Sequence, residues 1–328
     1  TRTLIGEEAF TAWGWRVPFL ISALLLGVSL WIRMQLQESP VFQKMKEEGT
    51  NSKAPIAEAF GKWKNARWAL IALLGAVAGQ AVVWYTGQFY AMFFLEKMLM
   101  VDGATTNILI AVALAIGTPF FIVFGWLSDK IGRKKIILSG CALAAVTYFP
   151  AFHLLSEAAN PALARAQAAS PVSVIVNDAD CSVQFDPVGK NTFDAKSCDI
   201  AKAFLAKGAI SYTSVEAAAG TIAQVRIGGE TFTAPDPARV TGAERKAAIA
   251  AFQAELKTAL GAAGYPAKAD PAAINTPLVI AVLTYLVLLV TMVYGPIAAL
   301  LVELFPTRIR YTAMSLPYHI GNGWFGGF

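Results

Sequence analysis

Charged residues are scarce in this chain, and their scarcity is the first guide to its class. Only 15% of its 328 residues are charged, while 56% are hydrophobic and the mean hydropathy is +0.52. An average soluble domain has about a quarter of its residues charged. The composition therefore excludes an ordinary soluble domain and indicates a membrane protein. No basic stretch with interleaved aromatic residues suggests a nucleic-acid partner.

Histidine and cysteine are also rare, which limits the chemistry available. The only histidines are His153 and His319, and the chain has three cysteines. No His and Cys residues have the spacing of a metal site, and no serine, aspartate or glutamate between 157 and 276 has a histidine in that segment to activate it. We therefore predict no metal, no cofactor and no enzymatic activity.

Long runs without charge take the place of those residues. A helix needs roughly 20 apolar residues to cross the hydrocarbon core of a membrane. We predict six such helices from uncharged runs at 17–32, 68–95, 104–127, 136–156, 275–302 and 311–328. The chain begins without Met or a signal-peptide pattern, and its sixth run is still apolar at residue 328, so we expect it to be a piece of a longer protein.

Basic residues between these runs give the orientation. The segments 33–67, 128–135 and 303–310 contain 13 Lys and Arg residues, whereas the short segments on the other side contain three, Arg2, Arg16 and Lys97. Because cytoplasmic loops are enriched in Lys and Arg, the first three segments are predicted to be cytoplasmic. The long segment 157–276 is then outside, and its 11 basic and 12 acidic residues do not affect the assignment.

One cytoplasmic loop, "GWLSDKIGRKK" (125–135), is more than a basic turn. The positive-inside rule explains Lys134 and Lys135 but not the carboxylate of Asp129. Gly125 would allow a neighbouring helix to approach closely, Gly132 would permit a turn closed to other residues, and Arg133 offers a forked donor.

This loop closely resembles the loop signature of the major facilitator superfamily, Gly-x-Leu-x-Asp-x-x-Gly-Arg-Lys. The stretches "WGWRVPFL" (13–20), "ESPVF" (38–42), "AGQAVVWYTGQFYAMFFL" (78–95) and "YGPIAALLVELFPTRIRYTAMSLPYHIGNGWFGG" (294–327) look like its metabolite:proton symporter branch, which includes proline/betaine, α-ketoglutarate, shikimate and citrate carriers. The resemblance covers nearly all of the chain except about 160–275.

The resemblance implies a fold class and a domain order. The chain would be an all-α polytopic membrane protein, part of a major facilitator fold, with a small α+β extracytoplasmic insertion. It would correspond to helices six to eleven of twelve. The order would be a helix six-like span (1–36), a central cytoplasmic linker (37–66), helices seven to nine (67–156), the insertion (157–276) and helices ten and eleven (277–328).

The resemblance also implies a function. The chain would be part of a secondary active transporter that carries a small organic acid or zwitterion with protons by alternating access. It would sit in a bacterial inner membrane with 157–276 in the periplasm, and its partners would be lipid, solute, protons and the N-terminal half of the protein. The loop would act as a conformational latch through Gly125, Asp129, Gly132, Arg133 and Lys134. Glu303 and Arg308 are further latch candidates, although a solvated helix end explains them nearly as well.

Polar and aromatic residues inside the spans indicate the transport pathway. Gln80, Trp84 and Gln88 recur at every fourth position and are predicted to share one helix face. The remaining candidates are Tyr85, Tyr90, Thr291 and Tyr294. Hydrogen bonding between helices is the alternative explanation. No Asp, Glu, Lys or Arg lies inside a complete span, so we place the proton carrier in the N-terminal half, with Glu303 and His319 as alternatives.

The segment from 158 to 275 has the pattern of a small domain. Apolar alternation predicts strands at 172–176 and 182–185 and a hairpin at 223–233 that turns at Gly228-Gly229. Helices are predicted at 199–208 and 241–264, the latter capped by Thr241 with Glu244 in a capping box. A solute-capturing lid, a partner-docking module and a passive ornament all stay open. A membrane-anchored sensor, with this domain binding the ligand, is the alternative function.

Two cysteines of this segment, Cys181 and Cys198, are predicted to form a disulfide. Cys141 lies within a span, where a thiol behaves as a small apolar group. Charge counting puts the other two outside, and the family resemblance makes that compartment an oxidising periplasm. The turn-rich sequence between them favours closure of the loop. Two free thiols are the alternative.

Overall fold

A computed structural model describes residues 5–36, 38–184, 186, 190–240 and 242–327. The chain forms two compact units. The first, which we call the helical unit, contains Thr1–Ala91, Asn107–Tyr148 and Leu283–Phe328. The second, which we call the α+β unit, contains Met92–Thr106 and Phe149–Val282.

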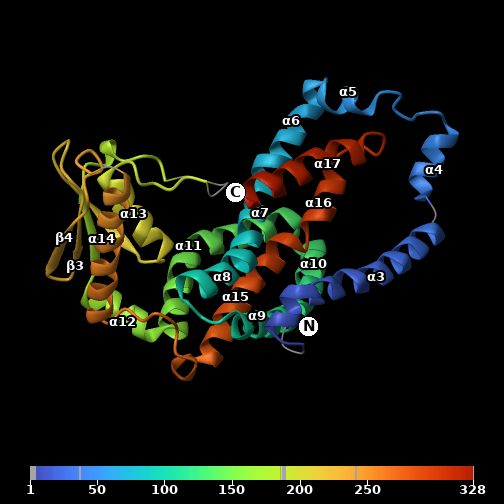
Figure 1. The fold of residues 1–328 in the computed structure, drawn as a ribbon. Helices are drawn as coiled ribbons and strands as arrows, with labels where there is room; N and C mark the ends of the chain where they lie inside the picture. The colour runs from blue at the N-terminus through green and yellow to red at the C-terminus, as the bar shows by residue number, and fades with distance from the viewer. Residues whose placement is uncertain (1–4, 37, 185, 187–189, 241, 328) are drawn as a thin grey trace. The chain divides into compact units, whose positions relative to one another are not determined.

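Helices make up most of the described chain (Figure 1). Before the α+β domain they are α2 (Glu7–Ala9), η1 (Phe10–Gly14), α3 (Arg16–Gln35), α4 (Pro40–Glu47), α5 (Pro55–Phe60), α6 (Trp63–Ala72), η2 (Leu73–Val77), α7 (Ala78–Tyr85), η3 (Thr86–Tyr90), α8 (Ala91–Phe93), η4 (Phe94–Met98), α9 (Gly103–Gly117), α10 (Pro119–Ile131) and α11 (Arg133–Ala159). After it they are α15 (Thr276–Tyr294), α16 (Ile297–Leu304), α17 (Arg310–Ile320) and η7 (Gly321–Gly326).

Five helical runs in the described residues are long and apolar enough to cross a membrane. They are Phe10–Gln35, Trp63–Met98, Gly103–Ile131, Arg133–Ala159 and Thr276–Leu304, and each contains one of the predicted apolar runs or most of it. The sixth predicted span is helical as α17 and η7 but is not among the five. The run Trp63–Met98 alternates between α-helical and π-helical turns, and two of the latter are Leu73–Val77 and Thr86–Tyr90.

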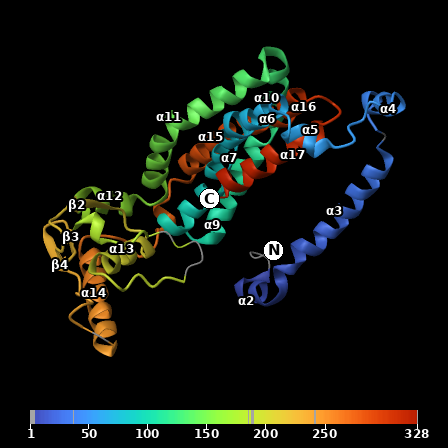
Figure 2. The same cartoon turned by 90° about the horizontal axis from the view of Figure 1, so that it is seen from above.

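Glycines bring three helices against the part of α15 from Leu283 onward, which belongs to the helical unit (Figure 2). A side chain added at Gly87 would meet Val290, one at Gly117 would meet Val287, and one at Gly140 would meet Val293. Small residues let transmembrane helices approach one another closely. The valines they face are almost fully buried: Val287 is 3% exposed and Val290 and Val293 are 0% exposed. The close packing of α15 therefore depends on glycines of the helices around it.

A second apolar cluster lies where α5 and α6 meet α16 and α17. It contains Ala59, Ala69, Ala72, Ala76, Val77, Ile137, Ile297, Leu301, Phe305, Ile309 and Ala313. Three of its five alanines, Ala69, Ala72 and Ala76, come from the run of α6 and η2, and the larger residues of α16 and the turn after it pack against them. In contrast, α3 has no buried residue in the described chain.

The α+β unit is built on a four-stranded sheet with the order β2-β1-β3-β4. Its strands are β1 (Val172–Val176), β2 (Tyr212–Glu216), β3 (Gln224–Ile227) and β4 (Glu230–Thr233). β1 pairs in parallel with β2, through a crossover that contains α13 (Ser197–Lys207), and antiparallel with β3. The β3–β4 hairpin turns at Gly228-Gly229 as predicted, with Gly228 at a φ of +56°.

Helices α13 and α14 (Gly242–Ala262) pack on this sheet (Figure 1). Val172, Val174 and Val176 of β1 are buried. On α14, Phe252, Leu256 and Leu260 recur at every fourth position and are the buried residues of that helix, as an amphipathic helix requires. Its predicted cap, Thr241, lies outside the described residues. Three shorter helices complete the unit, α12 (Pro161–Ala169), η5 (Asp178–Asp180) and η6 (Pro271–Ala273).

Two strand assignments differ from the prediction. The stretch 182–184 forms no strand, and Val183 is 83% exposed. The predicted strand is wrong over 182–184, because none of the described strands pairs with that stretch; residue 185, its last position, lies outside the described residues. β2 was not predicted, since at the edge of the sheet four of its five residues are exposed and the apolar alternation that marks a strand is absent.

Candidate functional site

The predicted latch loop is a sharp reversal between two long helices. α10 ends at Ile131 and α11 begins at Arg133, with only Gly132 between them. Gly132 has a φ of +102°, a conformation that other residues rarely adopt, so the prediction of a glycine-dependent turn is confirmed. The turn places Arg133 at the first position of α11, one turn from Asp129 on α10.

Arg133 joins two carboxylates. Its Nη2 lies 3.1 Å from Asp129 Oδ1 and 2.8 Å from Glu303 Oε1, and its Nε donates to Glu303 Oε2 at 3.0 Å. The two contacts to Glu303 form the parallel fork that guanidinium groups make with carboxylates. Glu303 is in α16, 170 residues further along the chain. The forked pair therefore fastens the α10–α11 turn to the end of α16.

Arg308 forms a second long-range pair, with Glu58 of α5. Arg308 is predicted as a latch residue without a named partner, and no sequence pattern marks Glu58, which is 250 residues away, as that partner. A hydrogen bond from Ser52 and then the Arg308 guanidinium hold the pKa of Glu58 below its usual value of 4.5. Glu58 is therefore ionised at neutral pH.

Together these pairs join three separate basic segments. Arg133 lies in 128–135, Glu303 and Arg308 in 303–310, and Glu58 in 33–67. Those are the three segments that charge counting places on one side of the membrane. The ion pairs bring them to one end of the helical unit.

The other two latch candidates have different surroundings. A side chain added at Gly125 would meet nothing within 4 Å in the described chain, whereas one at Gly295 would approach the α10 backbone at Phe121. A neighbouring segment does approach Gly125, whose backbone nitrogen would lie 3.7 Å from a side chain added at Gly295, but Gly295 is the residue that leaves room for this approach. Lys134 is exposed and has no ion pair among the described residues.

Two of the predicted pathway residues, Trp84 and Tyr294, stack on each other. Their ring centres are 5.8 Å apart with 20° between the planes. Phe121 of α10 meets Tyr294 edge-on, and the Tyr294 hydroxyl lies 3.0 Å from the hydroxyl of Tyr318 on α17. Tyr85 packs beside Trp84 and faces Gly326 of η7. α7, α10, α15 and α17 thus meet around one aromatic cluster, of which sequence reasoning missed Phe121 and Tyr318.

The remaining pathway candidates are spread around this cluster. Gln80 is fully buried and its amide has no hydrogen-bond partner in the described chain. Gln88 lies in the π-helical turns of η3 beside Leu283, at a void of about 10 Å³. Thr291 is buried and donates to the Leu288 carbonyl at 2.7 Å, and Tyr90 is exposed. π-helical turns change the rotation per residue, so the regular face predicted for Gln80, Trp84 and Gln88 does not continue past Tyr85.

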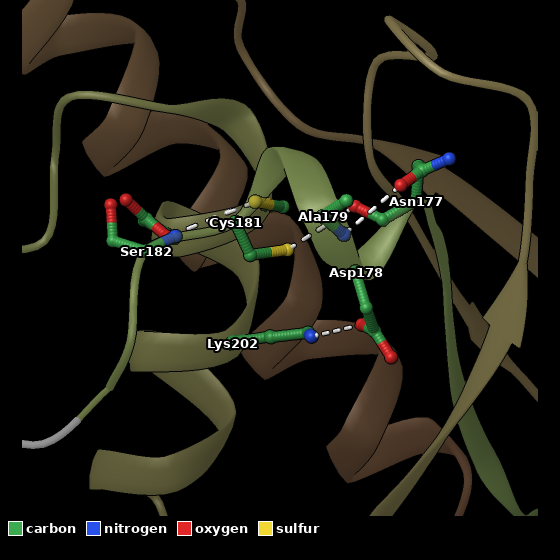
Figure 3. A network of polar contacts seen from close by, with 8 residues as sticks. Asn177, Asp178, Ala179, Cys181, Ser182 and Lys202 are labelled. Carbon is green, nitrogen blue, oxygen red and sulfur yellow. Dashed lines mark hydrogen bonds and ion pairs between the residues drawn. The ribbon is translucent and has the colours of Figure 1, made fainter.

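The predicted disulfide is wrong in this structure, because Cys181 and Cys198 are both free thiols. Each thiol donates to its own acceptor: Cys181 to the Asn177 carbonyl at 3.7 Å (Figure 3) and Cys198 to the Asp199 carboxylate at 3.7 Å. Burial, and then the neighbouring Cys181 thiol, raise the pKa of Cys198 well above its usual value.

Polar contacts around these thiols connect the two segments that the predicted disulfide would have joined. Asp199 accepts from the Ser182 backbone at 2.8 Å, and Lys202 pairs with Asp178 at 2.6 Å (Figure 3). Burial alone would lower the pKa of Lys202, but its hydrogen bond to Asp178 raises it above the usual value. These bonds fasten the segment after β1 to α13.

The α+β unit contains a cavity of about 290 Å³. It lies where β1 and β2 end, next to Val176 and Gly220, and beside Ser197 at the start of α13. Asp180 and Asp236 also line it. In sheets with parallel strands, ligands commonly bind beyond the carboxyl ends of the strands.

The sequence model of the Major Facilitator Superfamily matches residues 3–170 of this chain. The chain is 30% identical over 160 residues to a putative proline/betaine transporter of Staphylococcus haemolyticus, which covers 48% of this chain and 33% of the relative. It is 32% identical over 162 residues to a glycine betaine/proline/ectoine/pipecolic acid transporter of Dickeya dadantii (47% and 32%). It is 30% identical over 155 residues to an alpha-ketoglutarate permease of Escherichia coli (47% and 34%).

The chain spans about a third of the length of the curated relatives it matches. No solved structure gives a significant match. The family match covers half of the chain and ends two residues before β1. On this match, and with five helices among the described residues that are long and apolar enough to cross a membrane, the chain is a multi-pass membrane protein and belongs to the Major Facilitator Superfamily.

Proposed function

We propose that this chain is part of a secondary active transporter that carries a small organic acid or zwitterion together with protons. The strongest support comes from two ion pairs at one end of the helical unit, Arg133–Glu303 and Arg308–Glu58. In alternating access one end of a transporter closes while the other opens. Charged contacts between distant segments at one end are suited to hold it closed and to release it at low cost, since exposed pairs are worth only about 0.2–1 kcal/mol.

The aromatic cluster supports a solute-binding role for the helices that meet there. Trp84, Tyr294 and Tyr318 offer flat apolar faces together with two hydroxyl groups. Aromatic faces bind quaternary ammonium groups, and phenol hydroxyls donate to carboxylates. This combination suits betaines and organic acids, the classes of solute after which the relatives are named.

The proposal includes a location and a source of protons. By charge counting, the end with the ion pairs is cytoplasmic, residues 157–276 are periplasmic, and the membrane is the inner membrane of a bacterium. No Asp, Glu, Lys or Arg lies within the uncharged core of the complete spans. We therefore place the proton carrier in the part of the transporter that corresponds to the remaining two thirds of the relatives.

Uptake measurements test this function. Cells that express the gene encoding this chain are given labelled betaines, dicarboxylates, tricarboxylates and aromatic acids, with and without a protonophore. We expect one class to accumulate, and the protonophore to abolish accumulation. Uptake that is insensitive to the protonophore would contradict proton coupling, and no uptake of any class by correctly inserted protein would contradict the function.

The cavity of the α+β unit favours a second candidate, a membrane-anchored sensor. Its volume of about 290 Å³ is close to the lower end of the range for small-molecule sites. Removal of residues 161–273 separates the two functions. A transporter would keep its uptake of solute, whereas a sensor would lose its ligand. Binding of a solute by the whole protein that disappears with the domain, in the absence of any uptake, would favour the sensor.

A further inference from the structure

The helical unit has a cavity of its own, which the proposed transport function does not use. It has a volume of about 320 Å³ and lies between α6, α11 and α16. The described residues that line it include Trp68, Ile71, Leu138, Leu300 and Leu304, all of them apolar, and among those described residues Lys134 is the charged one. Ile71 and Leu138 are about half exposed, so the cavity opens on the outside of the unit as a groove.

The charge of Lys134 is not used by the latch next to it. Asp129 and Glu303, the carboxylates of that region, both pair with Arg133. Arg67 adds a second cation close by, 5.6 Å from the centre of the Trp68 ring. The groove therefore combines an apolar floor with two cations, Lys134 of α11 and Arg67 of α6, that form no ion pair with the described carboxylates.

We propose that this groove binds one anionic phospholipid, with an acyl chain along α6, α11 and α16 and the phosphate against Lys134. The three helices belong to runs that are long and apolar enough to cross a membrane, so lipid is the medium that surrounds them. Basic pockets between transmembrane helices bind anionic headgroups. Trp68 suits the level of the headgroups, where tryptophan is enriched.

Glycine is what keeps the groove open. A side chain added at Gly75 would touch only Ile71, at 3.9 Å, so a larger residue there would occupy the groove without displacing a helix. Gly75→Leu therefore tests the place of the acyl chain, and Lys134→Gln tests the place of the phosphate. Lys135→Gln and Gly323→Leu are the matched controls, because Lys135 does not line the groove and Gly323 is another open helical glycine.

The experiment is native mass spectrometry of the purified protein with phosphatidylglycerol, and with phosphatidylcholine of the same chains. We expect one tightly retained phosphatidylglycerol. Lys134→Gln should weaken it about fivefold, which is roughly 1 kcal/mol for one basic residue near an anionic headgroup. Gly75→Leu should also release it, and both controls should stay within about twofold of the parent protein.

Three results would overturn the proposal. Equal retention of the two lipids would remove the role of charge. Equal losses in Lys134→Gln and Lys135→Gln would mean a diffuse basic surface. Loss with Lys134→Gln but full retention with Gly75→Leu would place the lipid outside the groove. None of these measurements depends on transport, so they stand whatever the uptake experiments give.

Discussion

Arg133 contacts two carboxylates at once, Asp129 one helical turn away and Glu303 from a distant part of the chain. The sequence pattern indicated a latch that included Asp129, Arg133, Glu303 and Arg308, and the structure gives each of them an ion pair. The pattern could not give the partners. Glu58 is one of several carboxylates in a polar linker, and only the fold brings it to Arg308. Partner choice over such separations depends on packing, which local spacing does not record.

The latch leads to a prediction about the two carboxylates around Arg133. Glu303→Gln should impair uptake more than Asp129→Asn, because Glu303 receives two hydrogen bonds from the guanidinium group and Asp129 receives one contact. From the strength of exposed pairs, effects of about 1.5- to 5-fold are expected. Initial uptake rates, normalised to protein in the membrane, measure them, with Lys135→Gln as the control. A larger effect of Asp129→Asn would mean that Glu303 is not the main partner in the transport cycle.

The thiols of the α+β unit should differ in reactivity. Cys198 is 3% exposed and its pKa is raised by burial, so little of it is thiolate at pH 8 and its alkylation should still accelerate above pH 9. Cys181 is partly exposed and should react first. Maleimide labelling of Cys141→Ala variants that keep one of the two thiols, followed by mass spectrometry, measures both rates. If the pair in Cys141→Ala reacts only after a reductant is added, the disulfide exists after all.

Elements with strong patterns were predictable, and those whose pattern comes from their neighbours were not. Apolar periodicity predicts the strand Val172–Val176, the hairpin at Gly228 and the two helices α13 and α14. The edge strand Tyr212–Glu216 has no buried face, so its sequence lacks the apolar alternation that predicts a strand. The π-helical turns of Thr86–Tyr90 also left no trace in composition, although they decide where Gln88 lies.

The glycine contacts of α15 give a prediction for whole helices. In Gly140→Ala the new methyl group would lie 2.7 Å from Val293 and 3.0 Å from the Met292 Cβ, so α11 and α15 must separate. Overpacking of this kind costs about 1–3 kcal/mol. Gly75→Ala, in an open position, should be neutral or stabilising because alanine favours helix over glycine. Thermal unfolding in detergent compares the two, and equal melting temperatures would show that α15 can move aside.

For the molecule as a whole, the spans were predictable because they depend on composition alone. Five of the six predicted runs are helices of sufficient length. Charge counting predicts that the three basic segments share one side of the membrane. It does not predict that ion pairs join them to one another. The aromatic cluster around Tyr294 could not be predicted, since it needs the crossing of four helices that sequence periodicity does not place.

The pair between Glu58 and Arg308 allows a test at this level. Glu58→Arg should lower uptake by a factor of about two to five, and the exchange Glu58→Arg with Arg308→Glu should restore part of it, since the attraction is re-formed. The pKa of Glu58 is lowered, so the contribution of the wild-type pair is complete above pH 4.5 and is lost only as the pH falls through the lower folded-state value. Uptake rates of the two variants between pH 6 and 7.5 measure this, and failure of the exchange to restore any activity would exclude a direct role for the pair.

The long segment between α11 and α15 begins and ends at neighbouring residues. The Asn275 backbone donates to the carbonyl of Ala158 at 2.8 Å, so the chain leaves the domain beside the point where it enters. A gene could therefore gain or lose more than a hundred codons at this position without altering the distance between the flanking helices. Length variation among homologous genes should then be concentrated at this junction, and a domain of another ancestry should be tolerated there as readily as this one.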